Sequence, residues 1–203
     1  LTGLKKAESG SVIFKGEEIL NHSPRDIIER GLNSIPEDRQ LRGLVLDFSV
    51  AENIILKEYY KDKFSKKGIL DFPNIEKNAS DLSENYDIRP RNIKQFAGAL
   101  SGGNQQKVII AREISGDPDL LIAAQPTRGL DVGAIEYIRN FLIKQRDKGK
   151  AVLLISFELD EIMALSDRIS VIYNGKILRT FDAKETNERE LGLYMAGGKN
   201  EEK

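Results

Sequence analysis

The sequence contains neither cysteine nor tryptophan, and histidine occurs once among its 203 residues, at position 22. The missing cysteines exclude disulfide bonds, thiolate catalysis and cysteine-ligated zinc. With His22 as the sole imidazole, a histidine-based metal site or a catalytic triad is excluded as well. No apolar run approaches the roughly 18 residues of a membrane span, and the N-terminus lacks the apolar stretch of a signal peptide. The composition therefore predicts a soluble, cytoplasmic protein.

Charge of neither sign dominates, because 31 basic side chains stand against 32 acidic ones. The resulting net charge of −1 argues against a dedicated binder of nucleic acid or anionic membranes. Lysines and aromatic residues lie close together in KEYYKDKFSKKG, residues 57–68, but the interspersed acids favour a solvated surface there. We therefore expect a globular domain that binds no nucleic acid.

The first half of the chain carries signals for short elements. Alternating residues at 11–20 predict a hairpin, and Ser23 followed by proline predicts a helix that ends at Gly31. Ser49 and Glu52 have the spacing of a capping box, which predicts another helix. The following polar segment, up to residue 96, is expected to be mostly helical.

The second half has the pattern of an α/β protein. The runs at 119–124 and 151–156 are almost continuously apolar, as strands covered on both faces should be. Apolar residues at helical spacing fill 131–148 between them, so the two strands should pair in parallel through a right-handed crossover. The remaining expected features are a helix at 158–165, a strand hairpin at 168–181 that completes the α/β body, and a frayed tail at 197–203.

The sharpest local feature is LSGGNQQK at 100–107, in which Ser101, Gly102 and Gly103 precede an apolar helix. Free N–H groups at the positive end of a helix, beside a serine hydroxyl, suit an anion such as phosphate. By itself such a triplet is more often a plain N-cap after a flexible loop. The apolar strand and the turn QPTRGLD that follow favour the anion-binding interpretation.

These segments resemble the nucleotide-binding domain of ATP-binding cassette (ABC) transporters. LSGGNQQK is similar to the family's signature motif, and PTRGLD at 126–131 resembles the segment between the Walker B strand and the D-loop. SFELDEIMALSDRISVIYNGKI at 156–177 resembles the switch region and terminal hairpin. More narrowly, IPEDR at 35–39 and AAQPTRGLDVGAIEYI at 123–138 resemble the C-terminal cassette of tandem ATPases serving simple-sugar and nucleoside importers, nearest the nucleoside branch.

The resemblance implies an α/β fold of the P-loop NTPase type, with a mostly parallel sheet, flanking helices and a helical subdomain. It divides the chain into an N-terminal hairpin and Q-loop-like part (1–48), the helical subdomain (49–96), and a part with the signature, Walker B, D-loop and switch segments (97–203). No G-x-x-x-x-G-K-[ST] segment occurs. We therefore expect a cassette truncated before the Walker A motif, without the P-loop strand and helix.

Other departures from the family pattern affect chemistry. Ala124 and Gln125 stand where the family has Asp-Glu, so the Mg²⁺ carboxylate and the base for the attacking water are absent. Phe157 replaces the switch histidine, and Glu37 occupies the Q-loop position, where its charge would repel phosphate. We expect a degenerate site, and an isolated chain that is inactive and holds neither ATP nor Mg²⁺.

Family members work as head-to-tail pairs, which implies that the signature of this chain contacts ATP held by a sister N-terminal cassette. The residues implied are the signature Ser101, Gly102, Gly103, Asn104 and Gln105 and the D-loop Gly129, Leu130 and Asp131. Asp131 is also the expected N-cap of the next helix, and the two roles are compatible.

The resemblance implies an importer ATPase for a nucleoside or simple sugar. It would use ATP and Mg²⁺ in the full-length protein and lie on the cytoplasmic face of the membrane, against permease subunits. Without the P-loop strand and helix, the strands near 120–124 and 152–155 should expose an apolar edge and face, so the isolated chain should self-associate or be only marginally stable. A regulatory cassette outside hydrolysis is one alternative, which the intact LSGG disfavours; a non-transport cassette is another, which the near-neutral charge disfavours.

Overall fold

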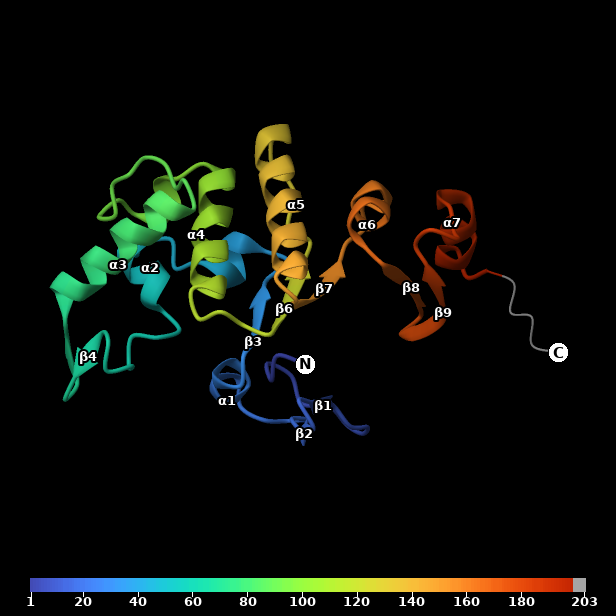
Figure 1. The fold of residues 1–203 in the computed structure, drawn as a ribbon, viewed down its shortest axis with the longest axis horizontal. Helices are drawn as coiled ribbons and strands as arrows, with labels where there is room; N and C mark the ends of the chain where they lie inside the picture. Colours follow the sequence, from blue (N-terminus) through green and yellow to red (C-terminus); the bar gives the residue numbers. More distant parts are fainter. Residues whose placement is uncertain (199–203) are drawn as a thin grey trace.

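The computed structural model describes residues 1–198 and centres on a parallel sheet (Figure 1). Its strands lie in the order β3 (Leu32–Ile35), β6 (Leu120–Ala124) and β7 (Ala151–Ile155). Helix α5 (Val132–Asp147) connects β6 to β7, so the predicted parallel strand, helix and strand are confirmed. The end of the tail expected to fray, residues 199–203, lies outside the described part.

The two faces of this sheet pack on different elements. Leu121 and Ala123 belong to the largest core cluster, together with residues of α4 (Gly102–Ile114) and α5. Ile122 points to the other face, where it packs with Ile19 and Ile27 beneath α1 (Pro24–Glu29). The predicted hairpin is confirmed as β1 (Ile13–Phe14) and β2 (Glu17–Glu18), and Ser23 caps α1 as predicted.

The capping box at Ser49 and Glu52 is confirmed at the start of α2 (Val50–Ile55). The next segment contains the hairpin β4 (Ser65–Lys66) and β5 (Ile69–Leu70) and then α3 (Phe72–Asn85), and a 3₁₀ turn η2 (Ala97–Ala99) follows it. The expectation of a mostly helical segment was wrong here. Lys67 and Gly68 both adopt positive φ, which makes a hairpin turn, and Asp71 caps a helix only from Phe72 onward.

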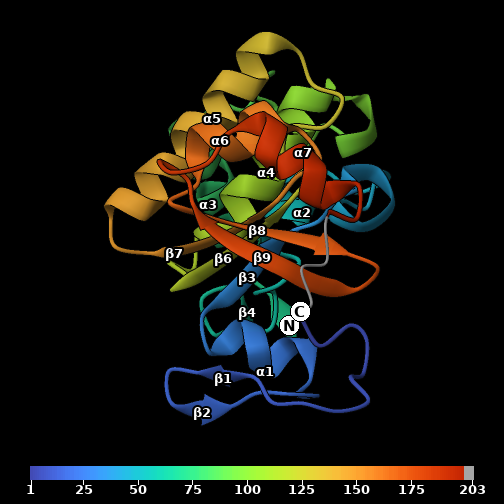
Figure 2. The same cartoon turned by 90° about the vertical axis from the view of Figure 1, so that its right-hand side faces the viewer.

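Helix α6 (Leu159–Leu165) and the hairpin of β8 (Arg168–Tyr173) and β9 (Lys176–Asp182) agree with the sequence prediction. The hairpin is a separate sheet rather than an extension of the central one. Helix α7 (Glu188–Met195), capped by Asn187, was not predicted, and Figure 2 shows it over the β8–β9 hairpin. Leu191 buries its side chain there against Ile169 and Phe181.

Strand β7 departs from the expectation of two covered faces. In β6, Leu121 and Ile122 are buried on opposite faces, as predicted. In β7, however, Leu153 is 40% exposed and Ile155 is 47% exposed. Leu153 lies beside Ile122 in register, but the cluster around Ile122 includes residues of β3 and β6 and none of β7. One face of β7 is therefore open.

No helix among residues 1–198 is long and apolar enough to cross a membrane.

Candidate functional site

The start of α4 presents donors to the surface. Ser101 caps the helix, and its exposed Oγ accepts a hydrogen bond from Asn104 Nδ2 at 2.9 Å. Because that oxygen accepts from Asn104, the Ser101 hydroxyl hydrogen is free to donate outward. The first-turn N–H groups of Gly102 and Gly103 have no acceptor within the helix. These groups, at the positive end of α4, fit a phosphate-like anion.

The other two predicted signature residues face different surroundings. Asn104 Oδ1 accepts from the Arg89 backbone N–H at 2.7 Å, so this amide braces the loop beside Ser101. Gln105 is buried, and its Nε2 donates to the Ala97 carbonyl at 3.1 Å. Its Oε1 accepts from Gln40 Nε2 at 3.2 Å. The structure therefore does not bring the Gln105 side chain to the surface with Ser101. The Gln105 side chain instead makes its hydrogen bonds in the interior, next to the signature.

The turn after β6, residues 125–131, is held from several sides. Two backbone groups of the turn are held first: Gln125 N donates to the Ile155 carbonyl at 2.8 Å, and the Pro126 carbonyl accepts from Gln106 Nε2 at 2.9 Å. Thr127 Oγ1 donates to Glu161 Oε1 at 2.8 Å. The Arg128 carbonyl accepts from Arg39 Nη1 at 2.8 Å. Asp131 ends the turn, and its Oδ1 accepts from Ala134 N at 2.9 Å, which confirms its N-cap role. Its D-loop role stays a prediction.

The signature and this turn lie in contact, although they are far apart in sequence. A Cβ atom on Gly103 would lie 3.1 Å from Ala134 Cβ and 3.7 Å from Asp131 Oδ2. A Cβ atom on Gly102 would lie 2.8 Å from Arg39 Nη2. Both glycines thus permit a close approach that a side chain would hinder. The fold brings residues 101–103 and 129–131 together on one surface.

The altered catalytic positions share the carboxyl edge of the parallel sheet. Glu37 follows β3, Ala124 ends β6 and Gln125 follows it, and Phe157 follows β7, 76% exposed. Gln125 is buried with φ +48°, and its Nε2 has no hydrogen-bond partner among residues 1–198. Within that range no group of His, Cys, Asp or Glu is arranged to hold a metal ion. Because Ala124 has no side-chain oxygen in place of the carboxylate, these residues do not fit Mg²⁺.

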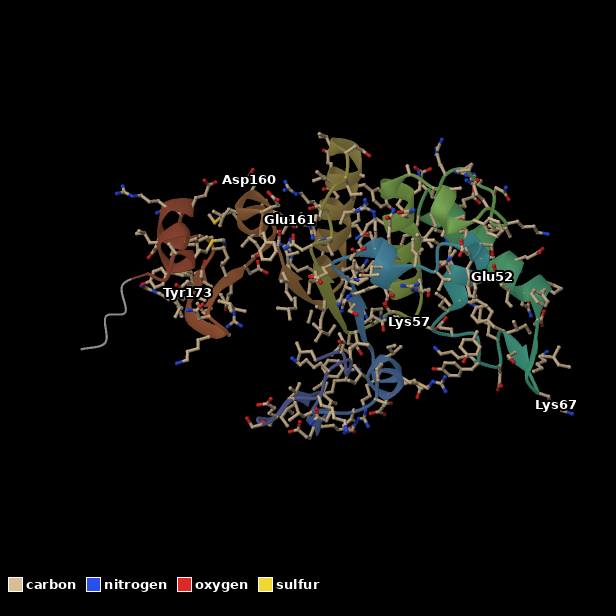
Figure 3. The ribbon with its side chains drawn as sticks, turned by 180° about the vertical axis from the view of Figure 1, so that it is seen from behind. Glu52, Lys57, Lys67, Asp160, Glu161 and Tyr173 are labelled. Carbon is tan, nitrogen blue, oxygen red and sulfur yellow. The ribbon has the colours of Figure 1, made fainter. Side chains whose placement is uncertain are left out.

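Glu161 was overlooked in the sequence. Glu158 and Asp160 are exposed near the start of α6, where acidic side chains are favoured by the helix dipole. Glu161 instead is fully buried and accepts the Thr127 hydrogen bond. Figure 3 shows Asp160 and Glu161 on α6, with Glu161 on the side nearer α5. The sequence did contain a signal for this burial. Glu161 lies four residues before Leu165, a spacing that places both side chains on the inward face of the helix.

A parallel sheet, flanking helices and a serine-capped glycine helix start together give the chain the fold of an ATP-binding cassette of the P-loop NTPase type. The family model described as ABC transporter matches residues 1–128, and the chain belongs to the ABC transporter family.

Two relatives are similar over almost the whole chain. Guanosine import ATP-binding protein NupO of Bacillus subtilis (strain 168) is 55% identical over 202 residues, which is 100% of this chain and 40% of that protein. Nucleoside import ATP-binding protein NupA of Lactococcus lactis subsp. cremoris (strain MG1363) is 54% identical over 198 residues, covering 98% of this chain and 39% of that protein. The chain thus spans about 40% of the length of these curated relatives.

Two solved structures carry the same fold. The nucleotide-free ATP-binding cassette of an ABC transporter superposes with a TM-score of 0.73 at 24% identity, over 96% of this chain and 76% of that one. The dimeric post-hydrolysis state of an ATP-binding cassette, bound to ADP and Pi, gives a TM-score of 0.72 at 23% identity, over 90% of this chain and 77% of that one. These likenesses establish the cassette fold.

Proposed function

We propose that this chain is a nucleotide-binding cassette of an import ATPase, and that its signature completes the ATP site of a sister cassette. One observation carries this proposal. The start of α4 keeps every donor suited to a phosphate and packs against the turn 129–131, whereas Ala124, Gln125 and Phe157 lack the groups for hydrolysis. A chain with an intact signature and a degenerate site of its own is suited to act on a nucleotide held elsewhere.

The relatives support the proposed substrate class. Two proteins more than half identical to this chain are named for guanosine and nucleoside import, which favours a nucleoside over a simple sugar. Permease subunits and the sister cassette are the proposed partners, on the cytoplasmic face of the membrane. The open face at Leu153 and Ile155 supports the further proposal that the isolated chain self-associates.

Transport tests the importer function directly. The assembled transporter, meaning this cassette with its sister cassette and permease subunits, is placed in vesicles with ATP on the cassette side. Labelled guanosine should accumulate only with ATP, and an excess of unlabelled nucleoside should compete where ribose does not. Accumulation of ribose instead would assign the sugar branch, and ATP-independent accumulation of both would contradict an import ATPase.

The isolated chain should bind Mg-ATP weakly. It contains no phosphate-binding P-loop sequence, and Ala124 cannot ligand the metal ion. The signature alone supplies few donors, so a dissociation constant above roughly 1 mM, near −4 kcal/mol, is expected. Isothermal titration with Mg-ATP measures it. A micromolar constant would show that this chain holds nucleotide through residues other than those named.

A further inference from the structure

We propose that Arg39 is a positioning residue that locks the start of α4 and the turn after β6 into one surface. This surface, called the trans surface below, comprises residues 101–103 and 129–131. The consequence for hydrolysis rests on the proposed function, but the locking itself does not.

The Arg39 guanidinium lies between the two halves of the trans surface. Nη1 donates to the Arg128 carbonyl at 2.8 Å. On the other side, Nη2, Cζ and Nε lie 2.8, 3.3 and 3.4 Å from the position of a Cβ on Gly102, so the planar group packs directly on that glycine. Nη1 and Nη2 also lie 4.0 and 3.9 Å from the corresponding position on Gly129. One side chain therefore packs on the signature and holds the backbone at Arg128, directly before the D-loop.

The backbone that carries Arg39 is itself fixed to α4. Arg39 begins a π-helix, η1 (Arg39–Gly43), which Asp38 caps by accepting from Gln40 N at 3.0 Å and Leu41 N at 2.9 Å. Gly43, at its end, has room for no Cβ, because Ile109 Cδ1 would lie 2.5 Å away. Arg112 Nη2 donates to the Gly43 carbonyl at 2.8 Å. Since both ends of η1 are held, Arg39 reaches the trans surface from a rigid base.

Arginine suits this position better than lysine. Its planar fork can donate to a carbonyl while its face packs on a glycine, whereas an ammonium group has neither the plane nor the span. A cation beside the positive end of α4 is unfavourable by itself. The Asp38 carboxylate offsets this positive charge. Hydrogen bonds from the N–H groups of Leu41 and Gln40, together with the charges of Arg128 and Arg39, keep the pKa of the Asp38 carboxyl below its ordinary value. Within residues 1–198, Arg39 Nε has no hydrogen-bond partner, although it is buried.

Hydrogen exchange on the chain itself tests the locking. In Arg39→Gln, peptides covering 101–106 and 126–131 should both exchange faster, by about tenfold, because a charged hydrogen bond and its packing are lost. Arg42→Gln is the matched control, since Arg42 is exposed on the same π-helix and makes no side-chain ion pair among the described residues. It should exchange as the unaltered chain does, and Arg39→Lys should be intermediate. Faster exchange in only one peptide, or equally fast exchange in Arg42→Gln, would overturn the proposal.

Steady-state kinetics of the assembled transporter tests the consequence. Arg39→Gln should lower kcat roughly ten- to hundredfold, because misplacing groups at a site by about 1 Å has effects of this size. KM for Mg-ATP should change less than about twofold, since the P-loop side of the sister site is untouched. Arg39→Lys should recover part of kcat, and Arg42→Gln should match the unaltered protein. Faster hydrogen exchange in both peptides with an unchanged kcat would overturn the role of Arg39 in hydrolysis. Normal ATP hydrolysis by a transporter whose signature donors are removed would instead contradict the proposed function.

Discussion

Replacing Ser101 by arginine is expected to abolish most ATP hydrolysis by the assembled transporter while this chain stays folded. The arginine side chain would fill the space in front of the α4 start and remove the neutral hydroxyl donor there. Loss of one donor at such a site lowers turnover by roughly a hundredfold or more. The fold should survive, since Ser101 is exposed and losing its cap costs about 1 kcal/mol. Steady-state ATPase rates give the first quantity, and thermal unfolding of the same variant gives the second.

Gln125→Glu is the comparison that makes this result decisive. It restores one carboxylate at the carboxyl edge of the sheet, but the side chain of Ala124 still offers no oxygen and that of Phe157 no hydrogen bond. The recovered base would have no held water to act on, so hydrolysis should change little. If Ser101→Arg keeps near-normal activity and Gln125→Glu raises it many-fold, the assignment is reversed and this chain's own site is the one that works.

Most of the fold was predictable because its signals are local. A capping box at Ser49 and Glu52, a proline after Ser23, and apolar runs at 119–124 and 151–156 each determine the backbone within a few residues of themselves. The anion-binding helix start was predictable for the same reason, since serine and two glycines act through their own backbone. The open face of β7, with Leu153 and Ile155 exposed, agrees with the expectation that the strands near 152–155 expose apolar surface.

The contacts that hold the site together were not visible in the sequence. Arg39 reaches Arg128 across 89 positions, and Thr127 reaches Glu161 across 34. The hydrophobic pattern carries no information about such pairs, and a glutamate near a helix start has a simpler explanation in the helix dipole. Gln105 was assigned to the surface with its signature neighbours, yet the helix turns its side chain inward. These side chains take their roles from packing between elements rather than from their own segments.

The largest loss of stability is expected for Glu113→Ala, near the end of α4 opposite the signature. The Glu113 carboxylate is fully buried, accepts from Arg112 Nε at 2.9 Å and pairs with Lys57 Nζ. The side chains of Arg112 and Lys57 are only 5% and 24% exposed. Removing the carboxylate leaves two cations with little water, a change that costs about 3–5 kcal/mol. For a chain of this size Tm should fall by roughly 6–20 °C, as measured by calorimetry and urea unfolding.

Two further variants separate this charge network from a general loss of packing. Glu113→Gln keeps the shape and part of the hydrogen bonding, so it should lose clearly less stability than Glu113→Ala. Glu84→Ala removes the carboxylate of an exposed pair with Arg91 and should change Tm little. Because Lys57 follows α2 and Glu113 lies on α4, the network ties segment 57–96 to the helix that carries the signature. Equal losses for Glu113→Ala and Glu84→Ala would show that this buried network does not hold the two parts together.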